Sequence, residues 1–399
     1  MAVNARKRQA VTRQLPSEWE VMDRWLLGTA APLVVLGLIM VASASVSIAD
    51  QLTGEPLYIF WRQLAFSALG MAIAAVLIKT PLARLEKLAP LTLIAAPIVL
   101  LLVFVPGLGH SVNGSARWID LGVSKFQVAE AAKLLMVVYV ASYLSRHYER
   151  LGKNLMQPLK PILLAGGLAA LLLMQPDYGS AVLICAVTAG TVWLAGARWR
   201  HLLALAAIGV PAMAAIAVAE PYRLRRLASF RDPWADPFAD GFQLTQALIA
   251  IGRGEWLGVG LGGSVQKLAY LPEAHNDFIF SVMAEELGFL GVIVLLALFS
   301  ALGWRILSLG QKALAMQQRF AAFLAYGIGL WLMLQAWISI GVNLGVLPTK
   351  GLTLPFISAG GSSLLVMWAA LGLLFRVAYE ANITNPASVR ARRVRGGPA

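Results

Sequence analysis

The sequence predicts an all-α, polytopic integral membrane protein. Of its 399 residues 59% are hydrophobic and only 13% are charged, whereas soluble domains are about half apolar and about a quarter charged. The charges are unbalanced, with 33 Lys and Arg against 20 Asp and Glu and a formal net charge of +13. A nucleic-acid binder explains only the positive charge. A membrane protein explains both features, because its cytoplasmic loops collect Lys and Arg.

About ten segments are long and apolar enough to cross a bilayer, which takes about 20 residues per helix. In chain order they are Trp25–Val46, Tyr58–Ile78, Leu88–Val105, Gln127–Leu144, Pro161–Met174, Gly179–Ala197, His201–Ala219, Phe278–Leu302, Phe320–Val342 and Ser362–Tyr379. They form one transmembrane domain, residues 25–379, between basic tails at 1–24 and 380–399. One long extracytoplasmic loop, residues 220–277, is expected between the seventh and eighth spans.

The basic residues predict the orientation of these spans. With both termini in the cytoplasm, the inner segments hold 22 of the 33 Lys and Arg and the outer loops hold nine. Six of those nine lie in the long loop, and long loops carry little orientation signal. We therefore expect both termini inside. Polar residues then gather on the outer face, in 111–125, 220–277 and 343–361, so a functional surface facing outward is expected.

Three ionisable residues crowd together where the long loop enters the eighth span. Glu273, His275 and Asp277 lie within five residues of one another. An Asp at this place is often an ordinary helix N-cap, and that alternative stays open for Asp277. A single cap does not require three ionisable groups, so this cluster is a candidate site.

Three more charges fall inside or at the edge of predicted spans. Glu130 and Lys133 are three residues apart and share one helix face, and Arg62 lies near the outer end of the second span. Intramembrane charges are expensive and mark functional sites by default. The alternatives are a self-neutralising structural pair for Glu130 and Lys133, and snorkelling of Arg62 to the headgroups. Two cations and one carboxylate leave a net positive site that suits a phosphate-bearing ligand.

Several common motifs carry no function here. Residues Gly258–Gly263 match G-x-G-x-x-G, but no strand or βαβ unit surrounds them, so loop packing is the better interpretation. No Walker motif, H-E-x-x-H or G-x-S-x-G is present, which gives ATP-driven pumping and the common hydrolase mechanisms no support. Cys185 is the single cysteine, so neither a disulfide framework nor a cysteine zinc site is expected.

Taken together, five segments resemble the SEDS family, the shape, elongation, division and sporulation proteins. The similar segments are Asn113–Lys133, Gln175–Gly179, Gly241–Gly263, Leu271–Gly288 and Leu347–Ser363, in the family's order. Asp23–Leu27, Ser43–Ser45 and Leu347–Pro355 are most similar to the family's cell-division branch. The sequence departs from the family pattern at Val128–Glu130, at Ala116-Arg117 and at Ser358–Gly361. Only the second departure removes a charged group, because one of two family arginines remains.

The resemblance implies a ten-span SEDS fold and a peptidoglycan glycosyltransferase. Such an enzyme polymerises lipid II into glycan strands by inverting transfer, with undecaprenyl pyrophosphate as the leaving group. In this sequence Asp277 would be the general base. Pyrophosphate and sugar would be bound by Arg62, Arg117 and Lys133, with Glu130 holding Lys133, and by His275 and Glu273. A divalent cation, Mg or Mn, could assist at the pyrophosphate, although the sequence contains no closed metal site.

The resemblance also implies partners and a location. A class B penicillin-binding protein would supply transpeptidation, because this chain has no Ser-x-x-Lys transpeptidase domain, and other division proteins would join at the septum of the bacterial inner membrane. Three alternatives stay open: a lipid II flippase, a polymerase of the elongation branch and a non-catalytic scaffold. Loss of Asp277 would affect the flippase less than the polymerase, and the scaffold would tolerate loss of all the charged groups.

Overall fold

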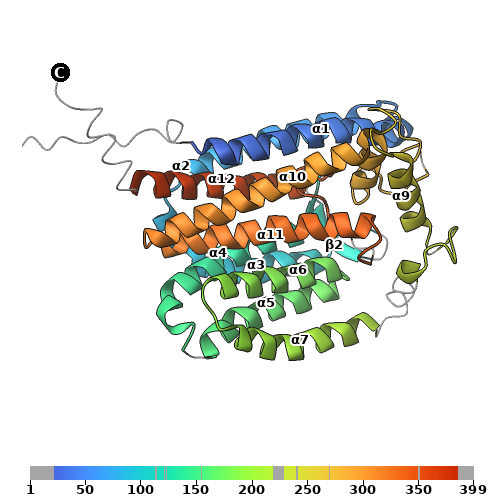
Figure 1. The fold of residues 1–399 in the computed structure, drawn as a ribbon. Helices are drawn as coiled ribbons and strands as arrows, with labels where there is room; N and C mark the ends of the chain where they lie inside the picture. Colours follow the sequence, from blue (N-terminus) through green and yellow to red (C-terminus); the bar gives the residue numbers. More distant parts are fainter. Residues whose placement is uncertain are drawn as a thin grey trace, which may run out of the picture.

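Long apolar helices packed side by side make up most of the computed structural model (Figure 1). It describes residues 22–112, 115–120, 122, 124–153, 155–218, 229–239, 241–268, 270–348 and 351–384. The predicted basic tails therefore lie almost wholly outside the described residues. The start of α1 and the end of α12 lie at the same end of the bundle, and the small sheet and α9 lie at the other (Figure 1).

The helices confirm the predicted all-α membrane fold. Each of the ten predicted spans falls on a helix, and eight helices of the described chain are long and apolar enough to cross a membrane. The exact number of crossings stays a prediction. The helices are α1 (Arg24–Thr53), α2 (Tyr58–Lys79), α3 (Leu82–Leu101), α4 (Val128–His147), α5 (Met156–Met174), α6 (Tyr178–Leu194), α7 (Trp199–Val218), α9 (Phe242–Arg253), α10 (Ile279–Ala315), α11 (Arg319–Asn343) and α12 (Gly361–Thr384).

Burial divides the bundle into a core and an outer layer. Most of α4, α11 and α12 is buried inside the protein, whereas α2 and α3 expose most of their length. Helix α11 contacts α4, α6, α10 and α12, so it lies at the centre. An inner helix can carry polar side chains that a lipid-facing helix cannot, because protein partners there replace water. The polar residues of α4 and α11 therefore share the protein interior.

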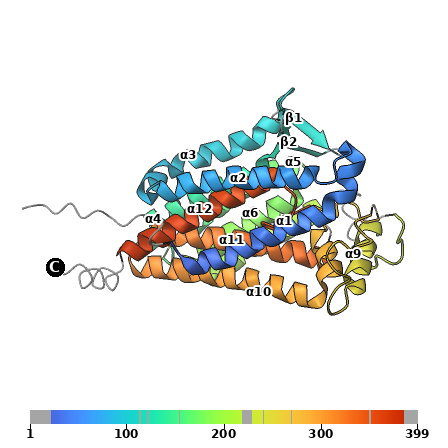
Figure 2. The ribbon, with the colours of Figure 1, turned by 90° about the horizontal axis from the view of Figure 1, so that it is seen from above.

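A small antiparallel sheet lies at the end of the bundle opposite the start of α1 and the end of α12 (Figure 2). Its strands are β1 (Gly109–Val112), β2 (Ser115–Asp120) and β3 (Lys125–Gln127), in the order β1-β2-β3. The sequence analysis did not predict this sheet, because its strands are short and carry no long apolar alternation. Strand β3 runs directly into α4, so the sheet is anchored to the buried core.

Helix α10 is broken near its N-terminal end, at Gly288. This residue has φ 66° and ψ −167°, a backbone region that is essentially restricted to glycine. Gly258 packs against the break, and a Cβ on Gly288 would lie 2.3 Å from the Gly258 nitrogen. The amides of Val259 and Gly260 donate to the carbonyls of Glu285 and Glu286, at 3.0 and 3.1 Å. The G-x-G-x-x-G segment is therefore a packing device for α10.

This contact predicts that Gly288→Ala destabilises the protein. The new methyl group would meet the backbone of the 257–258 segment and force a disfavoured backbone conformation, at a cost of about 1–3 kcal/mol. The control is Gly28→Ala on α1, where no atom lies within 4 Å of the new Cβ. Thermal unfolding in detergent should show a lower midpoint for Gly288→Ala only. Equal midpoints for the two variants would contradict the proposed role of the glycine pair.

Candidate active site

Asp277 lies immediately before α10 in the chain. The helix begins at Ile279 with Phe278 at its N-cap position, so Asp277 lies one residue before the N-cap. Asn343, the last residue of α11, donates from Nδ2 to the Asp277 carbonyl at 3.0 Å. The Oδ1 of Asn343 accepts from the amide and the hydroxyl of Ser281, at 3.2 and 2.8 Å. One buried amide thus fixes both the Asp277 backbone and the first turn of α10.

A second set of contacts fixes the residues before Asp277. The Ser358 hydroxyl donates to the Asn276 carbonyl at 2.8 Å, and the Ala359 amide donates to the His275 carbonyl at 3.0 Å. Gln63 of α2 in turn donates from Nε2 to the Ser358 carbonyl at 3.1 Å. The backbone that carries Asp277 is therefore held from α2, α11 and the segment that leads into α12.

Arg117 of β2 reaches the same place from the sheet. Its guanidinium donates to the backbone carbonyls of Gln175 and Pro176, at the turn between α5 and α6. A Cβ on Gly351 would lie 3.2 Å from Asp277 Oδ2 and 3.9 Å from Arg117 Nη1. The Asp277 carboxylate and the Arg117 guanidinium therefore both lie close to Gly351, and the distance between Oδ2 and Nη1 is no more than the sum of these two distances.

Glu130 and Lys133 form a buried network next to this site. Lys133 is 2% exposed, and its Nζ donates to Glu130 Oε1 and to Gln335 Oε1, both at 2.8 Å. The ammonium group also lies 5.4 Å from the centre of the Trp331 ring. Gln335 donates from Nε2 to the Thr353 carbonyl at 3.0 Å. The network therefore supports, from inside the protein, the 351–360 segment that passes Asp277.

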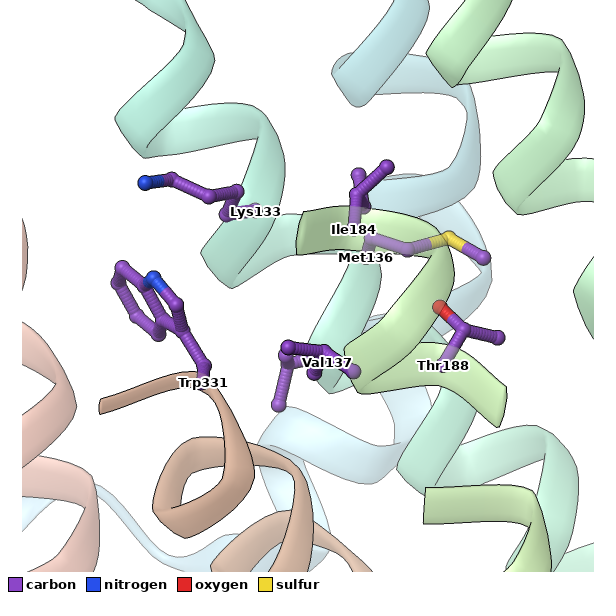
Figure 3. Close-up of a pocket in the computed structure, with 7 residues that line it drawn as sticks. Lys133, Met136, Val137, Ile184, Thr188 and Trp331 are labelled. Atoms are coloured by element: carbon purple, nitrogen blue, oxygen red, sulfur yellow. The ribbon is translucent and has the colours of Figure 1, made fainter. Parts of the chain in front are cut away.

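A small cavity lies beside Lys133. Figure 3 shows that its lining side chains come from α4, α6 and α11, with Lys133 and Trp331 on one side and Ile184 and Thr188 on another. Its volume of about 10 Å³ is room for about one water molecule. It is therefore far too small to hold a sugar or a pyrophosphate.

The remaining predicted site residues lie in different surroundings. Arg62 is exposed on α2, with its guanidinium carbon 5.6 Å from the centre of the Tyr58 ring on the same helix. Glu273 is exposed and accepts from Asn276 Nδ2 at 3.4 Å. Burial lowers the pKa of the His275 imidazole below its ordinary value, and the Glu273 carboxylate offsets this only in part. The structure brings Arg117 and Asp277 close together at Gly351.

The sequence analysis did not single out the uncharged residues that position the site. Gln63, Gln335 and Asn343 are all buried, and each bonds a backbone group of the outer loops. A signal was available, because an amide side chain within an apolar span is itself unusual and needs a partner. Among the described residues, no three His, Cys, Asp or Glu side chains form a group that could hold a metal ion.

The buried pair predicts a strong effect for Lys133→Met. That variant leaves the Glu130 carboxylate buried without its ion-pair partner at 2.8 Å, which typically destabilises a protein by about 3–5 kcal/mol. The double variant Glu130→Gln/Lys133→Met should recover most of this loss, because it buries no unpaired charge. Thermal unfolding in detergent compares the two. A double variant as unstable as Lys133→Met would show that the pair is not the source of the effect.

Known proteins resemble this chain over nearly its whole length. The family model described as cell cycle protein, of the FtsW, RodA and SpoVE group, matches residues 23–383. The probable peptidoglycan glycosyltransferase FtsW of Halorhodospira halophila is 50% identical over 364 residues, 91% of this chain and 92% of that protein. Its counterpart in Thioalkalivibrio sulfidiphilus is 50% identical over 377 residues, 94% of each chain.

Solved structures share the fold. A chain of a peptidoglycan synthase complex matches with a TM-score of 0.73 and 31% identity, over 90% of this chain and 98% of that one. The crystal structure of the rod shape determining protein RodA of Thermus thermophilus matches with a TM-score of 0.66 and 30% identity, over 91% and 98%. The arrangement of helices described above is therefore that of these proteins. This chain is a multi-pass membrane protein and belongs to the FtsW/RodA/SpoVE family of cell cycle proteins.

Proposed function

We propose that this chain is a peptidoglycan glycosyltransferase that polymerises lipid II into glycan strands at the division septum of the bacterial inner membrane. The observation that carries the proposal is that the Asp277 carboxylate and the Arg117 guanidinium both lie within 4 Å of one point beside Gly351. The names of the FtsW relatives support the activity. The basic inner loops support an orientation with both termini in the cytoplasm and this site on the outer face.

The reaction needs one base and one anion-binding group. The acceptor sugar hydroxyl attacks the anomeric carbon of the donor, a new C–O bond forms, and the bond from that carbon to the pyrophosphate oxygen breaks. Asp277 takes the hydroxyl proton. Because pyrophosphate leaves readily, no general acid is required, and a single displacement inverts the anomeric carbon. One carboxylate that takes the proton and one fixed guanidinium that binds the pyrophosphate are therefore sufficient for this reaction.

Arg117 is the proposed ligand of the leaving pyrophosphate. A guanidinium binds phosphate oxygens through two parallel N–H groups, and donors already fixed in place stabilise the charge that develops as the bond breaks. The Gln175 and Pro176 carbonyls hold the Arg117 side chain in place. We propose that His275 and Glu273, next to Asp277 in the chain, contact the sugars, and that Arg62 acts at the headgroup level of the lipid carrier.

Lys133 has a less direct proposed role. It is buried and bonded to Glu130 and Gln335, so contact with pyrophosphate would require the segment at Thr353 to move. We propose that its positive charge favours an anion at the outer surface and that its network holds the 351–360 segment in place. A Mg or Mn ion at the pyrophosphate also stays a proposal, and no step above is routed through it, since Asp277 alone would not make a closed metal site.

The similar proteins also support a protein partner for this chain and its place in the cell-division branch of the family. Because the matched complex coordinates polymerization and crosslinking, we propose a class B penicillin-binding protein as partner, together with other division proteins. The FtsW relatives are 50% identical to this chain and the RodA structure is 30% identical, which favours division over elongation. Purified protein with its partner, given lipid II in detergent, should make glycan polymer. A flippase or a scaffold would make none.

We predict that Asp277→Asn abolishes polymerisation. The amide keeps the shape of the carboxylate and cannot accept the acceptor proton, and a positioned base typically contributes about 10²–10⁴ in rate. The matched control is Asp50→Asn, which neutralises an exposed carboxylate on α1 that has no role in the proposed site, and it should retain most activity. The measurement is glycan polymer formed from lipid II, with size-exclusion profiles to show that each variant folds. Polymer at a near wild-type rate from Asp277→Asn would remove Asp277 from the mechanism.

Gly351→Ala should lower the rate without unfolding the protein. Its methyl group would lie 3.2 Å from Asp277 Oδ2 and 3.9 Å from Arg117 Nη1, close to both groups that are proposed to act on the substrate. The matched control is Gly360→Ala in the same segment, whose Cβ meets no atom closer than 3.5 Å. Lipid II polymerisation should fall by about tenfold or more for Gly351→Ala only, as expected when reacting groups are misplaced by about 1 Å. Equal rates for the two variants would place the chemistry elsewhere.

A further inference from the structure

The loop between α9 and Ser264 has two unlike sides. On its outer side three large apolar side chains are exposed, Trp256 by 70%, Leu257 by 74% and Leu261 by 60%. The Trp256 ring packs edge-on against the Phe289 ring of α10, with the centroids 5.3 Å apart. Phe289 belongs to the exposed apolar face of this span, together with Leu290, Ile293 and Val294. The exposed side of the loop therefore continues the lipid-facing surface of α10.

The inner side of the loop is polar and closed. The side chains of Glu285 and Glu286 are completely buried. Arg253 pairs with Glu285 at 2.8 Å, and Lys267 pairs with Glu286 at 2.7 Å. The Ser43 hydroxyl of α1 donates to Glu286 at 2.7 Å. Every buried charge of this cluster is therefore paired, as a position at membrane depth requires.

The loop backbone is paired with α10 as well. Besides the two amides that bond the Glu285 and Glu286 carbonyls, the Glu255 carbonyl accepts from Phe289 N at 2.9 Å and the Trp256 carbonyl accepts from Leu290 N at 3.2 Å. These bonds replace the helical bonds that α10 loses at Gly288. Non-helical backbone occurs at membrane depth only where protein satisfies its polar groups, and this loop meets that condition.

The depth of the loop follows from the length of α10. Arg305 pairs with Asp23 at the end of the bundle where the described chain begins, and its neighbour Trp304 is 65% exposed, as in an interfacial aromatic belt. A hydrocarbon layer needs about 20 helical residues, which places the opposite boundary near Glu285. A tilted α10 needs more residues to cross the hydrocarbon layer, which moves the boundary closer to the N-terminal end of the helix. Phe289 and the Trp256 ring that packs on it then lie inside the hydrocarbon edge.

We infer that residues 256–261 insert into the bilayer, with Trp256, Leu257 and Leu261 among the acyl chains just below the headgroups of the leaflet on the sheet side. Arg253 and Glu255, both exposed, lie at headgroup level. The loop thereby sets the height of the buried charge cluster relative to the membrane. This inference does not depend on the proposed glycosyltransferase activity.

The test uses single-cysteine variants of the full chain in lipid nanodiscs. Leu257→Cys and Leu261→Cys are made in a Cys185→Ala background and labelled with the same fluorophore. Leu290→Cys on the exposed face of α10 is the lipid control, and Ser111→Cys, exposed on β1, is the aqueous control. Quenching is measured with lipids that carry a doxyl group high on the acyl chain and, separately, with aqueous iodide. Two loop positions guard against a variant that fails to fold.

We expect both loop labels to be quenched by the doxyl lipid as strongly as the Leu290→Cys label, and by iodide at least several-fold less than the Ser111→Cys label. Iodide quenching equal to that of Ser111→Cys would place the loop in water and overturn the inference. Protection from both quenchers would show that protein covers the loop, through a second copy of the chain, and would overturn it as well.

Discussion

The ammonium group of Lys133 is buried in the protein, 2% exposed, and is held at 2.8 Å by Glu130 on its own helix and by Gln335 on α11. A charge there must be neutralised within the protein, because unpaired burial costs several kcal/mol. Gln335 meets this demand and also holds the Thr353 carbonyl. The Gln335 side chain that bonds the buried ammonium group of Lys133 therefore also fixes the backbone of the segment beside Asp277.

The need for protein partners in the absence of solvent contact also applies to the backbone around Asp277. Asp277 lies on irregular backbone, and its neighbours are held by Asn343 from α11 and by Ser358. Further along the chain, α10 is broken at Gly288. The loop at Gly258 forms backbone hydrogen bonds with α10 at this break, and the paired carboxylates of Glu285 and Glu286 lie beside it. The buried carboxylates of Glu285 and Glu286 are each paired with a basic side chain. The short helical stretch between Asp277 and Gly288 is held at both ends as a result.

Apolar segments of about 20 residues were enough to predict the helices, because the thickness of the hydrocarbon layer sets their length. The pairing of Glu130 with Lys133 also followed from their spacing along a helix. The direction of the Arg62 side chain could not be predicted from the sequence, since snorkelling and inward pointing are equally consistent with a charge near a span end. The small sheet and the contact between Gly258 and Gly288 depend on tertiary packing, which leaves no periodic signal in so short a stretch.

In the proposed mechanism Asp277 takes the proton of the acceptor hydroxyl, and Arg117 binds the pyrophosphate. The most direct test is the affinity of the purified protein for lipid II. The account predicts that Asp277→Asn binds lipid II about as tightly as the wild type. Arg117→Gln should lose about tenfold or more, since a hydrogen bond to a charged group contributes about 1.5–3 kcal/mol. Loss of binding by Asp277→Asn, with full binding retained by Arg117→Gln, would contradict the account.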